Sequence, residues 1–130
     1  MLNGTVNIGG HEWNVKEEKR GGPQTQLLSL TAIDSHEACM QIRLGAAQEA
    51  RTLEEVELYA ADPAIRWFTD AAGHRWEARI VVQSDPKGFD RQLVKFISDS
   101  RIVREGEYGL AGGLGLRSDE ELRTLLEKAG

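Results

Sequence analysis

The sequence contains very little cysteine and no long apolar stretch. Its single cysteine, Cys39, cannot close an internal disulfide, and no charged-then-apolar signal segment follows Met1. No apolar run approaches the roughly 20 residues that a membrane-spanning helix needs. These absences predict a cytoplasmic protein that does not itself span a membrane.

Positive charge is also scarce. The chain of 130 residues carries 16 Lys and Arg against 21 Asp and Glu, for a net charge of −5. Binding to a phosphate backbone depends on many clustered Lys and Arg side chains, so this balance argues against a general nucleic-acid binder. The length fits one ordinary domain, or two half-size units that share a core.

A short stretch that occurs twice organises the rest of the chain. Residues 10–13 read Gly-His-Glu-Trp, and residues 73–76, which lie 63 positions later, read Gly-His-Arg-Trp. Two further segments, 26–30 and 51–56, have matches 66 positions later, in the same order. A three-residue insertion near residues 84–88 accounts for the change of offset. Such a pattern predicts a tandem duplication of about 65 residues.

Each copy of the repeated stretch is expected to begin a β-strand. Residues 7–10 and 70–73 place Asn or Asp first and Gly fourth, which are the preferred residues of a type I turn. Apolar and polar residues alternate after both turns, which puts Trp13 and Trp76 on a buried face. The strand before the second turn, residues 65–69, is well supported by its aromatic side chains, and its counterpart near residues 2–6 is weaker.

Two more strands are expected in each copy. Alternating apolar residues at 28–32 and 94–96 predict matched core strands, and composition predicts a loop at 19–23. Residues 36–44 have the propensity for either a helix or a strand. The alternation of Met40, Ile42 and Leu44 favours a strand, as does the glycine-rich segment 106–110 in the second copy.

A helix is predicted to close each copy. Residues 52–55 and 118–121 are Ser/Thr-x-x-Glu capping boxes, so helices are expected at about 52–61 and 118–129. Pro63 marks a boundary. The predicted fold is α+β, with two tandem β-rich units at 1–62 and 64–130. Each unit has antiparallel hairpins and one closing helix, and the sheet-like or small-barrel units are expected to be related by a pseudo-twofold axis.

The repeated histidines and tryptophans suggest a ligand site. His11 and His74 occupy equivalent places, so a paired site with Trp13 and Trp76 is conceivable, and a metal would need further ligands such as His36 and Cys39. The spacing matches no closed zinc pattern. The alternative interpretation is that both histidines are exposed on the polar face while the indoles, including that of Trp67, pack in the core.

Two other features bear on catalysis and on phosphate binding. Cys39 can be activated by His36 in principle, but residues three apart on a strand point to opposite faces, which favours a structural cysteine. The glycine-rich segment 109–116 precedes a helix, as phosphate-cradling loops do. It lacks the Lys-Ser/Thr ending, and the acidic residues 119–121 would repel an anion, so we predict a flexible connector.

Partner binding is the remaining use of these segments. Leu110, Leu114 and Leu116 are expected to be exposed and to form a lip that binds a partner. Arg101 and Arg104, with other arginines nearby in the repeat, can form a local basic strip for an acidic partner, or can be ordinary surface arginines.

The sequence therefore predicts a non-catalytic protein-interaction module. It would act as an adaptor or accessory subunit of a larger protein assembly, or as a self-associating scaffold. The reason is that the candidate metal, catalytic-cysteine and phosphate sites each lack residues that such a site needs. Its partner would be another protein or a second copy of the chain. The alternative is a small-ligand or metal-binding sensor that uses His11, His74, Trp13 and Trp76, and a further rival is an enzyme that uses Cys39. No catalytic, metal or cofactor-binding residue is assigned, and no cofactor is expected.

Overall fold

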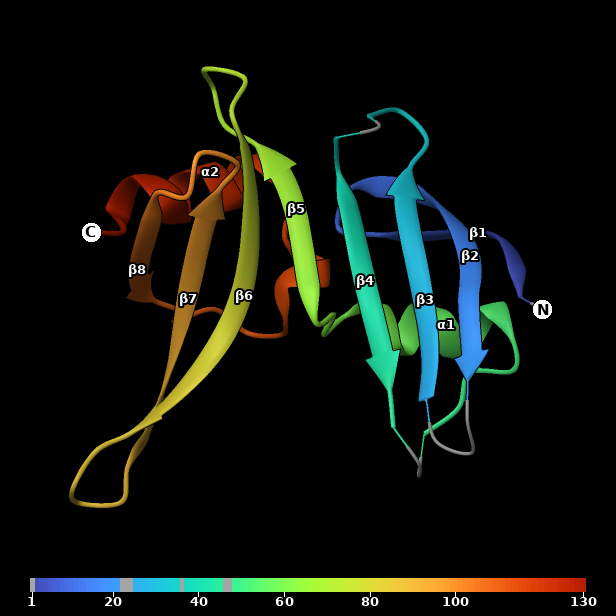
Figure 1. Ribbon diagram of the computed structural model, residues 1–130, viewed down its shortest axis with the longest axis horizontal. Coiled ribbons are helices and arrows are strands. Elements are labelled where there is room, and N and C mark those ends of the chain that lie inside the picture. Colours follow the sequence, from blue (N-terminus) through green and yellow to red (C-terminus); the bar gives the residue numbers. More distant parts are fainter. Residues whose placement is uncertain (1, 22–24, 36, 46–47) are drawn as a thin grey trace.

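The computed structural model describes residues 2–21, 25–35, 37–45 and 48–130. Within these residues the chain forms one eight-stranded antiparallel sheet, in which each strand pairs with its neighbours in sequence (Figure 1). The strands are β1 (Asn3–Ile8), β2 (His11–Gly21), β3 (Thr25–Ala32), β4 (Cys39–Leu44), β5 (Ile65–Thr69), β6 (Arg75–Ser84), β7 (Asp90–Ser98) and β8 (Val103–Glu107). Two α-helices, α1 (Leu53–Ala60) and α2 (Asp119–Lys128), and a short 3-10 helix, η2 (Leu114–Leu116), accompany the sheet. The predicted α+β class is confirmed.

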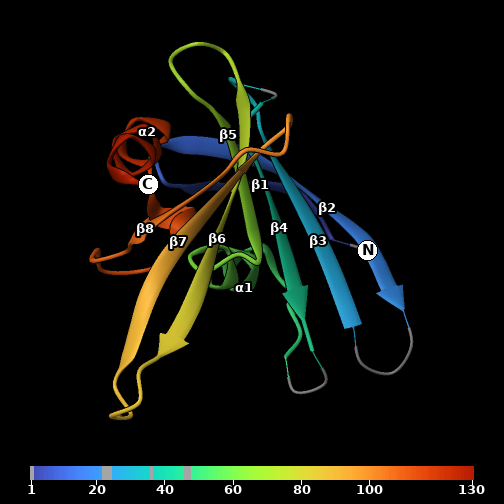
Figure 2. The ribbon, with the colours of Figure 1, turned by 60° about the vertical axis from the view of Figure 1, so that its left-hand side comes forward.

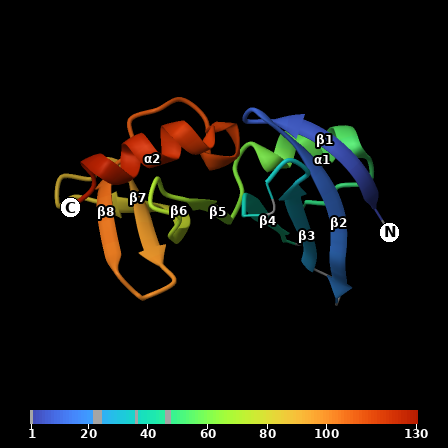
Figure 3. The same cartoon turned by 90° about the horizontal axis from the view of Figure 1, so that it is seen from above.

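Both α-helices lie on the same side of the sheet (Figure 3). Because side chains alternate along a strand, buried Trp76 and Ala78 of β6 face the helices, whereas Arg75, Glu77 and Arg79 face the other side. No helix of the described chain covers that second side, which we call the open face. The β6–β7 hairpin extends well beyond the rest of the sheet (Figures 1 and 2).

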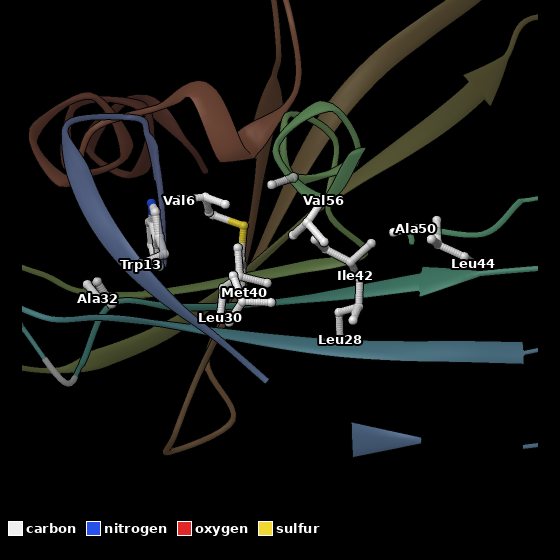
Figure 4. Packing of buried hydrophobic residues seen from close by; sticks show 13 residues of the cluster. Val6, Trp13, Leu28, Leu30, Ala32, Met40, Ile42, Leu44, Ala50 and Val56 are labelled. Atoms are coloured by element: carbon white, nitrogen blue, oxygen red, sulfur yellow. The ribbon is translucent and has the colours of Figure 1, made fainter. Parts of the chain in front are cut away.

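The first half of the chain, residues 2–63, has its own apolar core beneath α1. The side chain of Trp13 is fully buried there, and its Nε1 donates a hydrogen bond of 2.7 Å to the carbonyl oxygen of Ile8. Burying an indole removes about 150–250 Å² from water, which is worth roughly 4–6 kcal/mol as an upper limit. The core residues that alternate along the strands, as predicted, include Val6, Trp13, Val15, Leu28, Leu30, Ala32, Met40 and Ile42, and Val56 joins them from α1 (Figure 4).

The second half, residues 64–130, has a separate core beneath α2. The rings of Phe68 and Phe96 meet edge to face with their centroids 5.9 Å apart. The Trp76 side chain is 5% exposed, and its Nε1 donates a hydrogen bond to Asp70 Oδ2 at 2.9 Å. The cluster comprises Phe68, Trp76, Ala78, Val94, Phe96, Tyr108, Leu114, Leu122 and Leu126. Both repeated tryptophans therefore serve core packing.

Each half consists of four strands followed by an α-helix. The strand predicted within residues 36–44 is confirmed as β4, although His36 lies outside the described residues. Both helices have the predicted N-cap residue, because Thr52 Oγ1 accepts from the Glu55 amide and Ser118 Oγ accepts from the Glu121 amide. The predicted capping box is complete at Ser118, whose amide donates to Glu121 Oε1, whereas at Thr52 the hydroxyl donates to Glu55 Oε1. None of the helices in the described part of the chain has the length and apolar character to cross a membrane.

Two local predictions need correction. The first turn is centred on Gly9 and Gly10, with φ of 61° and 82°, and it joins the paired residues Ile8 and His11. A two-residue hairpin turn with both φ values positive matches the strand twist better than the predicted type I turn at 7–10. The predicted loop at 19–23 is also wrong in part, because β2 continues to Gly21; residues 22–24 lie outside the described chain.

The second turn agrees with its prediction. The amide of Gly73 donates to the Asp70 carbonyl at 3.1 Å, and Asp70 Oδ1 accepts from the amides of Ala72 and His74, at 2.9 Å each. Burial raises the pKa of Asp70, but the hydrogen bond from Trp76 and those from the two amides outweigh this effect, so the pKa lies below its usual value. The carboxylate thus organises the hairpin in its ionised form.

Candidate functional site

The two halves meet at β4 and β5, where a cluster of charged side chains is buried. Only three residue pairs join these strands, including Met40 with Arg66. The Arg66 side chain is fully buried, and its Nη2 donates to Asp119 Oδ1 at 2.5 Å. Its guanidinium carbon lies 4.9 Å from the ring centroid of Trp13. A planar guanidinium can stack and donate together, so Arg66 connects the first-half core to the first residue of α2.

His11 completes this cluster from the start of β2. Its Nδ1 lies 2.8 Å from Asp34 Oδ1, its Nε2 lies 3.2 Å from Asp119 Oδ1, and its side chain is only 12% exposed. Its ring also meets Trp13 edge to face at 5.3 Å. The interpretation of His11 as an exposed histidine is therefore wrong, because the hairpin packs against the start of α2. Both ring nitrogens are engaged within the protein.

The electrostatics of the cluster favour fixed charges. Burial lowers the pKa of Arg66, and the hydrogen bond and charge of Asp119 oppose this change. Burial raises the pKa of Asp119, but Arg66 and His11 outweigh that effect, so its pKa lies below its usual value. Asp119 therefore remains ionised at neutral pH. Such a pair connects the two halves through opposite charges in contact.

The structure does not bring the repeated histidines into one environment. His11 lies in the buried cluster, whereas His74 is exposed in the turn before β6. Among residues 2–21, 25–35, 37–45 and 48–130, no group of three or more His, Cys, Asp or Glu side chains is arranged to hold a metal ion. Cys39 is partly buried and pairs with Trp67 across β4 and β5. Its predicted partner His36 lies outside the described residues.

The end of the glycine-rich segment 109–116 packs against the first half, whereas residues 109–112 are exposed. A Cβ on Gly115 would lie 1.6 Å from the carbonyl oxygen of Ala60, and the Gly115 amide donates to the Ala61 carbonyl at 3.3 Å. Leu114 beside it is fully buried. The prediction of an exposed Leu114 is therefore wrong, and the predicted connector is packed against α1 over residues 113–115. Glycine is needed here because two backbones approach closely at the end of α1.

The open face of the second half contains a hollow of about 650 Å³. We call it the basic hollow. Its lining comprises Trp67, Arg75, Trp76, Glu77, Arg79, Val81, Lys95, Ile97, Ser98, Asp99 and Arg101. The predicted Arg101 is thus one wall of the hollow, whereas Arg104 is not among the lining residues and its guanidinium carbon lies 5.6 Å from the Trp76 ring centroid. The other cationic side chains of the lining are Arg75 and Arg79 of β6 and Lys95 of β7. Each occupies a position whose side chain points to the open face, as the alternation of side chains along a strand requires.

The basic hollow differs in charge from the rest of the protein. Its lining holds four cationic side chains, Arg75, Arg79, Lys95 and Arg101, and two anionic ones. Residues 1–63 carry five basic and ten acidic side chains, whereas residues 64–130 carry eleven of each. The whole net charge of −5 therefore belongs to the first half. Cations gathered on an acidic protein create a local field that favours an anionic partner.

Within the hollow, aromatic and cationic groups lie together. The guanidinium carbon of Arg75 is 5.6 Å from the ring centroid of Trp67, and Arg79 Nε lies 2.9 Å from Glu77 Oε2. Arg101 has a φ of 68° in the turn between β7 and β8. A non-glycine residue in this left-handed region costs of order 1 kcal/mol or more; such residues occur in tight turns and are enriched at functional sites. The residue with the positive φ, Arg101, therefore also lines the hollow.

A second concavity lies on the helix side, between the halves. We call it the leucine cleft; its volume is about 670 Å³, and its lining comprises Asn7, Ile8, Gly9, Glu54, Glu57, Leu58, Ala61 and Leu116. Leu116 is 39% exposed, as predicted, but it lies with Leu58 and apart from buried Leu114. Leu110 is 40% exposed and is not among the lining residues. The predicted leucine lip is therefore replaced by a different set of residues.

Among known proteins, no protein-family model, curated protein or solved structure matches this chain.

Proposed function

We propose that the protein is a non-catalytic interaction module, an adaptor or accessory subunit of a larger assembly, whose basic hollow binds an acidic segment of a partner protein. The observation that carries this proposal is the gathering of Arg75, Arg79, Lys95 and Arg101 beside Trp67 on the open face. Arginine and tryptophan are among the residue types that dominate protein interfaces.

The shape and charge of the hollow favour an extended acidic segment. The lining residues come from three adjacent strands and a turn, so the surface is broad and open. Carboxylates can accept two parallel hydrogen bonds from an arginine, and an apolar side chain beside them can pack on the exposed part of Trp67. The net charge of −5 limits long polyanions, because the field outside the hollow repels them.

The charged cluster between the halves supports a non-catalytic role. His11, Asp119 and Arg66 are the residue types of many active sites, but here they bind one another. Both ring nitrogens of His11 lie against aspartate oxygens of the protein itself, at 2.8 and 3.2 Å, which leaves neither facing a bound substrate. The same contacts do not favour the alternative sensor, which requires His11 as a ligand.

We also infer that the two halves are tandem copies, with units at 1–62 and 64–130. The repeated stretch falls at the start of β2 and of β6, and both tryptophans are buried. The strand order β1 to β8, with both helices on one side, favours side-by-side repetition over the expected pseudo-twofold axis. An experimental structure in which the halves fail to superimpose would remove this inference.

The interaction proposal is tested by charge reversal in the hollow. The probe is a dye-labelled synthetic peptide rich in Asp and Glu with one central Trp, and binding is measured by fluorescence anisotropy at low and high salt. We expect Arg79→Glu to weaken binding by about tenfold or more, and added salt to weaken wild-type binding. Arg51→Glu, the same change at a side chain that is 77% exposed in the first half, should leave binding unchanged.

Equal binding by Arg79→Glu and wild type, at unchanged melting temperature, would refute the assignment of the hollow. Absence of binding by wild type to the acidic peptide, with binding to a matched Lys-rich peptide, would refute the charge argument. Photo-crosslinking from position 95 to the peptide should place it on the open face.

A further inference from the structure

We propose that the leucine cleft is a second docking site, which takes an amphipathic, Lys- or Arg-bearing helical segment of a partner protein. The cleft lies on the helix side of the sheet and shares no lining residue with the basic hollow. The proposal therefore does not rest on the function of the hollow.

Helix α1 presents two different faces, and only one of them is used within the protein. Leu53, Val56, Tyr59 and Ala60 belong to or pack against the first-half core. A second stripe follows the helical spacing of three and four residues and consists of Glu54, Glu57, Leu58 and Ala61. Leu58 on this stripe is 77% exposed. The large apolar side chain of Leu58 therefore lies in the cleft and makes few contacts with the rest of the protein.

The opposite wall of the cleft is held in place by backbone contacts. Leu116 follows Gly115, whose amide donates to the Ala61 carbonyl at the end of α1. The turn residue Gly9 also approaches this wall, because a Cβ there would lie 2.4 Å from the Gly115 carbonyl oxygen. The cleft is therefore formed before a partner arrives, which reduces the ordering cost of binding. Since its walls come from both halves, it exists only while they are docked.

The charge of the cleft selects the partner. Glu54 and Glu57 are exposed on its rim, and the lining includes no basic residue among those that the structure describes. The surrounding first half carries the entire net charge of the chain. An identical cleft of a second copy would bring Glu against Glu, which disfavours symmetric self-association. A helix with apolar side chains on one face and Lys or Arg at its flanks complements both Leu58 with Leu116 and the acidic rim.

Two matched pairs of variants test the proposal. The probe is a dye-labelled synthetic helical peptide built from Leu and Lys, with a Leu and Glu peptide of the same pattern for comparison. We expect the Leu/Lys peptide to bind wild type, and Leu58→Ser and Glu57→Lys each to weaken this binding by about tenfold. Leu110→Ser and Glu127→Lys make the same changes at exposed positions outside the cleft and should bind as wild type does.

Melting temperatures of all variants are compared to exclude unfolding, and because Leu58 and Glu57 are exposed, little change is expected. Equal affinity of Leu58→Ser and Leu110→Ser would overturn the proposal, as would tighter binding of the Leu/Glu peptide. Sedimentation that shows self-association of wild type, abolished by Leu58→Ser, would make a second copy the occupant and would also overturn it. None of these results depends on Arg79→Glu, so the two docking surfaces fail or succeed separately.

Discussion

Removing the carboxylate of Asp119 should show how strongly the buried charge cluster holds the two halves together. In Asp119→Ala the fully buried guanidinium of Arg66 loses its carboxylate partner, which lies at 2.5 Å in the native protein. Leaving a buried charge uncompensated costs about 3–5 kcal/mol, which is at least about a fifth of the typical 5–15 kcal/mol that stabilises a domain. Urea unfolding followed by tryptophan fluorescence measures this loss directly, because Trp13 contacts Arg66.

Two further variants separate the charge effect from a general effect on α2. Glu120→Ala alters the next residue, which is exposed, and should cost no more than about 1 kcal/mol even with the loss of a favourable helix-dipole interaction. The double variant Arg66→Met with Asp119→Ala removes the stranded charge, so it should be more stable than Asp119→Ala alone. The reasoning would be refuted if Asp119→Ala cost no more than Glu120→Ala, or if the double variant lost the sum of both single effects.

The pH dependence gives an independent check with a defined sign. The pKa of Asp119 in the folded protein lies below its ordinary value of 3.8, so ionised Asp119 contributes stability that is fully present above that value. This contribution is lost as the pH falls below 3.8 towards the folded pKa. Asp119→Ala should therefore show a shallower loss of unfolding free energy than wild type in this acid range, and parallel curves would contradict the assigned shift.

Three other perturbations test the packing. Trp76→Ala should cost about 3–5 kcal/mol as a large-to-small core change, whereas His74→Ala, at an exposed site, should stay within about 0.5 kcal/mol; calorimetry on both variants decides whether the hairpin faces are assigned correctly. Gly115→Ala should cost at least about 2 kcal/mol because its new Cβ would overlap the end of α1, whereas Gly109→Ala, with no atom within 4 Å of its Cβ position, should melt near the wild-type temperature. The buried Gln26 side chain accepts a hydrogen bond from the Ala50 amide at 2.9 Å and donates one to the Ala50 carbonyl at 3.0 Å. Gln26→Leu should therefore cost about 1–3 kcal/mol and speed hydrogen exchange of the Ala50 amide. An unchanged exchange rate would mean that these two bonds do not form in solution.

Elements whose formation depends on local periodicity were predictable from the sequence. Alternation placed Trp13 and Trp76 in the cores, and the strand at β4 followed from Met40, Ile42 and Leu44. The predicted cap residues Thr52 and Ser118 marked the starts of both helices, because the side-chain oxygen of each accepts from an amide three residues away. These signals act over two to four residues, so no knowledge of the fold was required.

The candidate sites were predictable only where they share that periodicity. The sequence predicts Arg101 as a partner-binding residue, and the structure places it in the lining of the hollow. Arg75, Arg79 and Lys95 join it there because alternate positions of β6 and β7 share the open face. Leu116 was identified correctly as exposed, whereas Leu114 was not, since nothing in a glycine-rich segment indicates which neighbour will be covered.

The sequence by itself determined the strands, the helix starts and the buried indoles, because each depends on neighbouring residues and on the separation of apolar from polar side chains. Tertiary structure alone decided that His11 meets Asp119, 108 positions away, and that Arg66 is buried against Trp13. It also decided that glycines near the C-terminus allow η2 to pack on α1. The reason is physical: a charge or a glycine acquires its role from whatever surface folds against it, and that surface lies elsewhere in the chain.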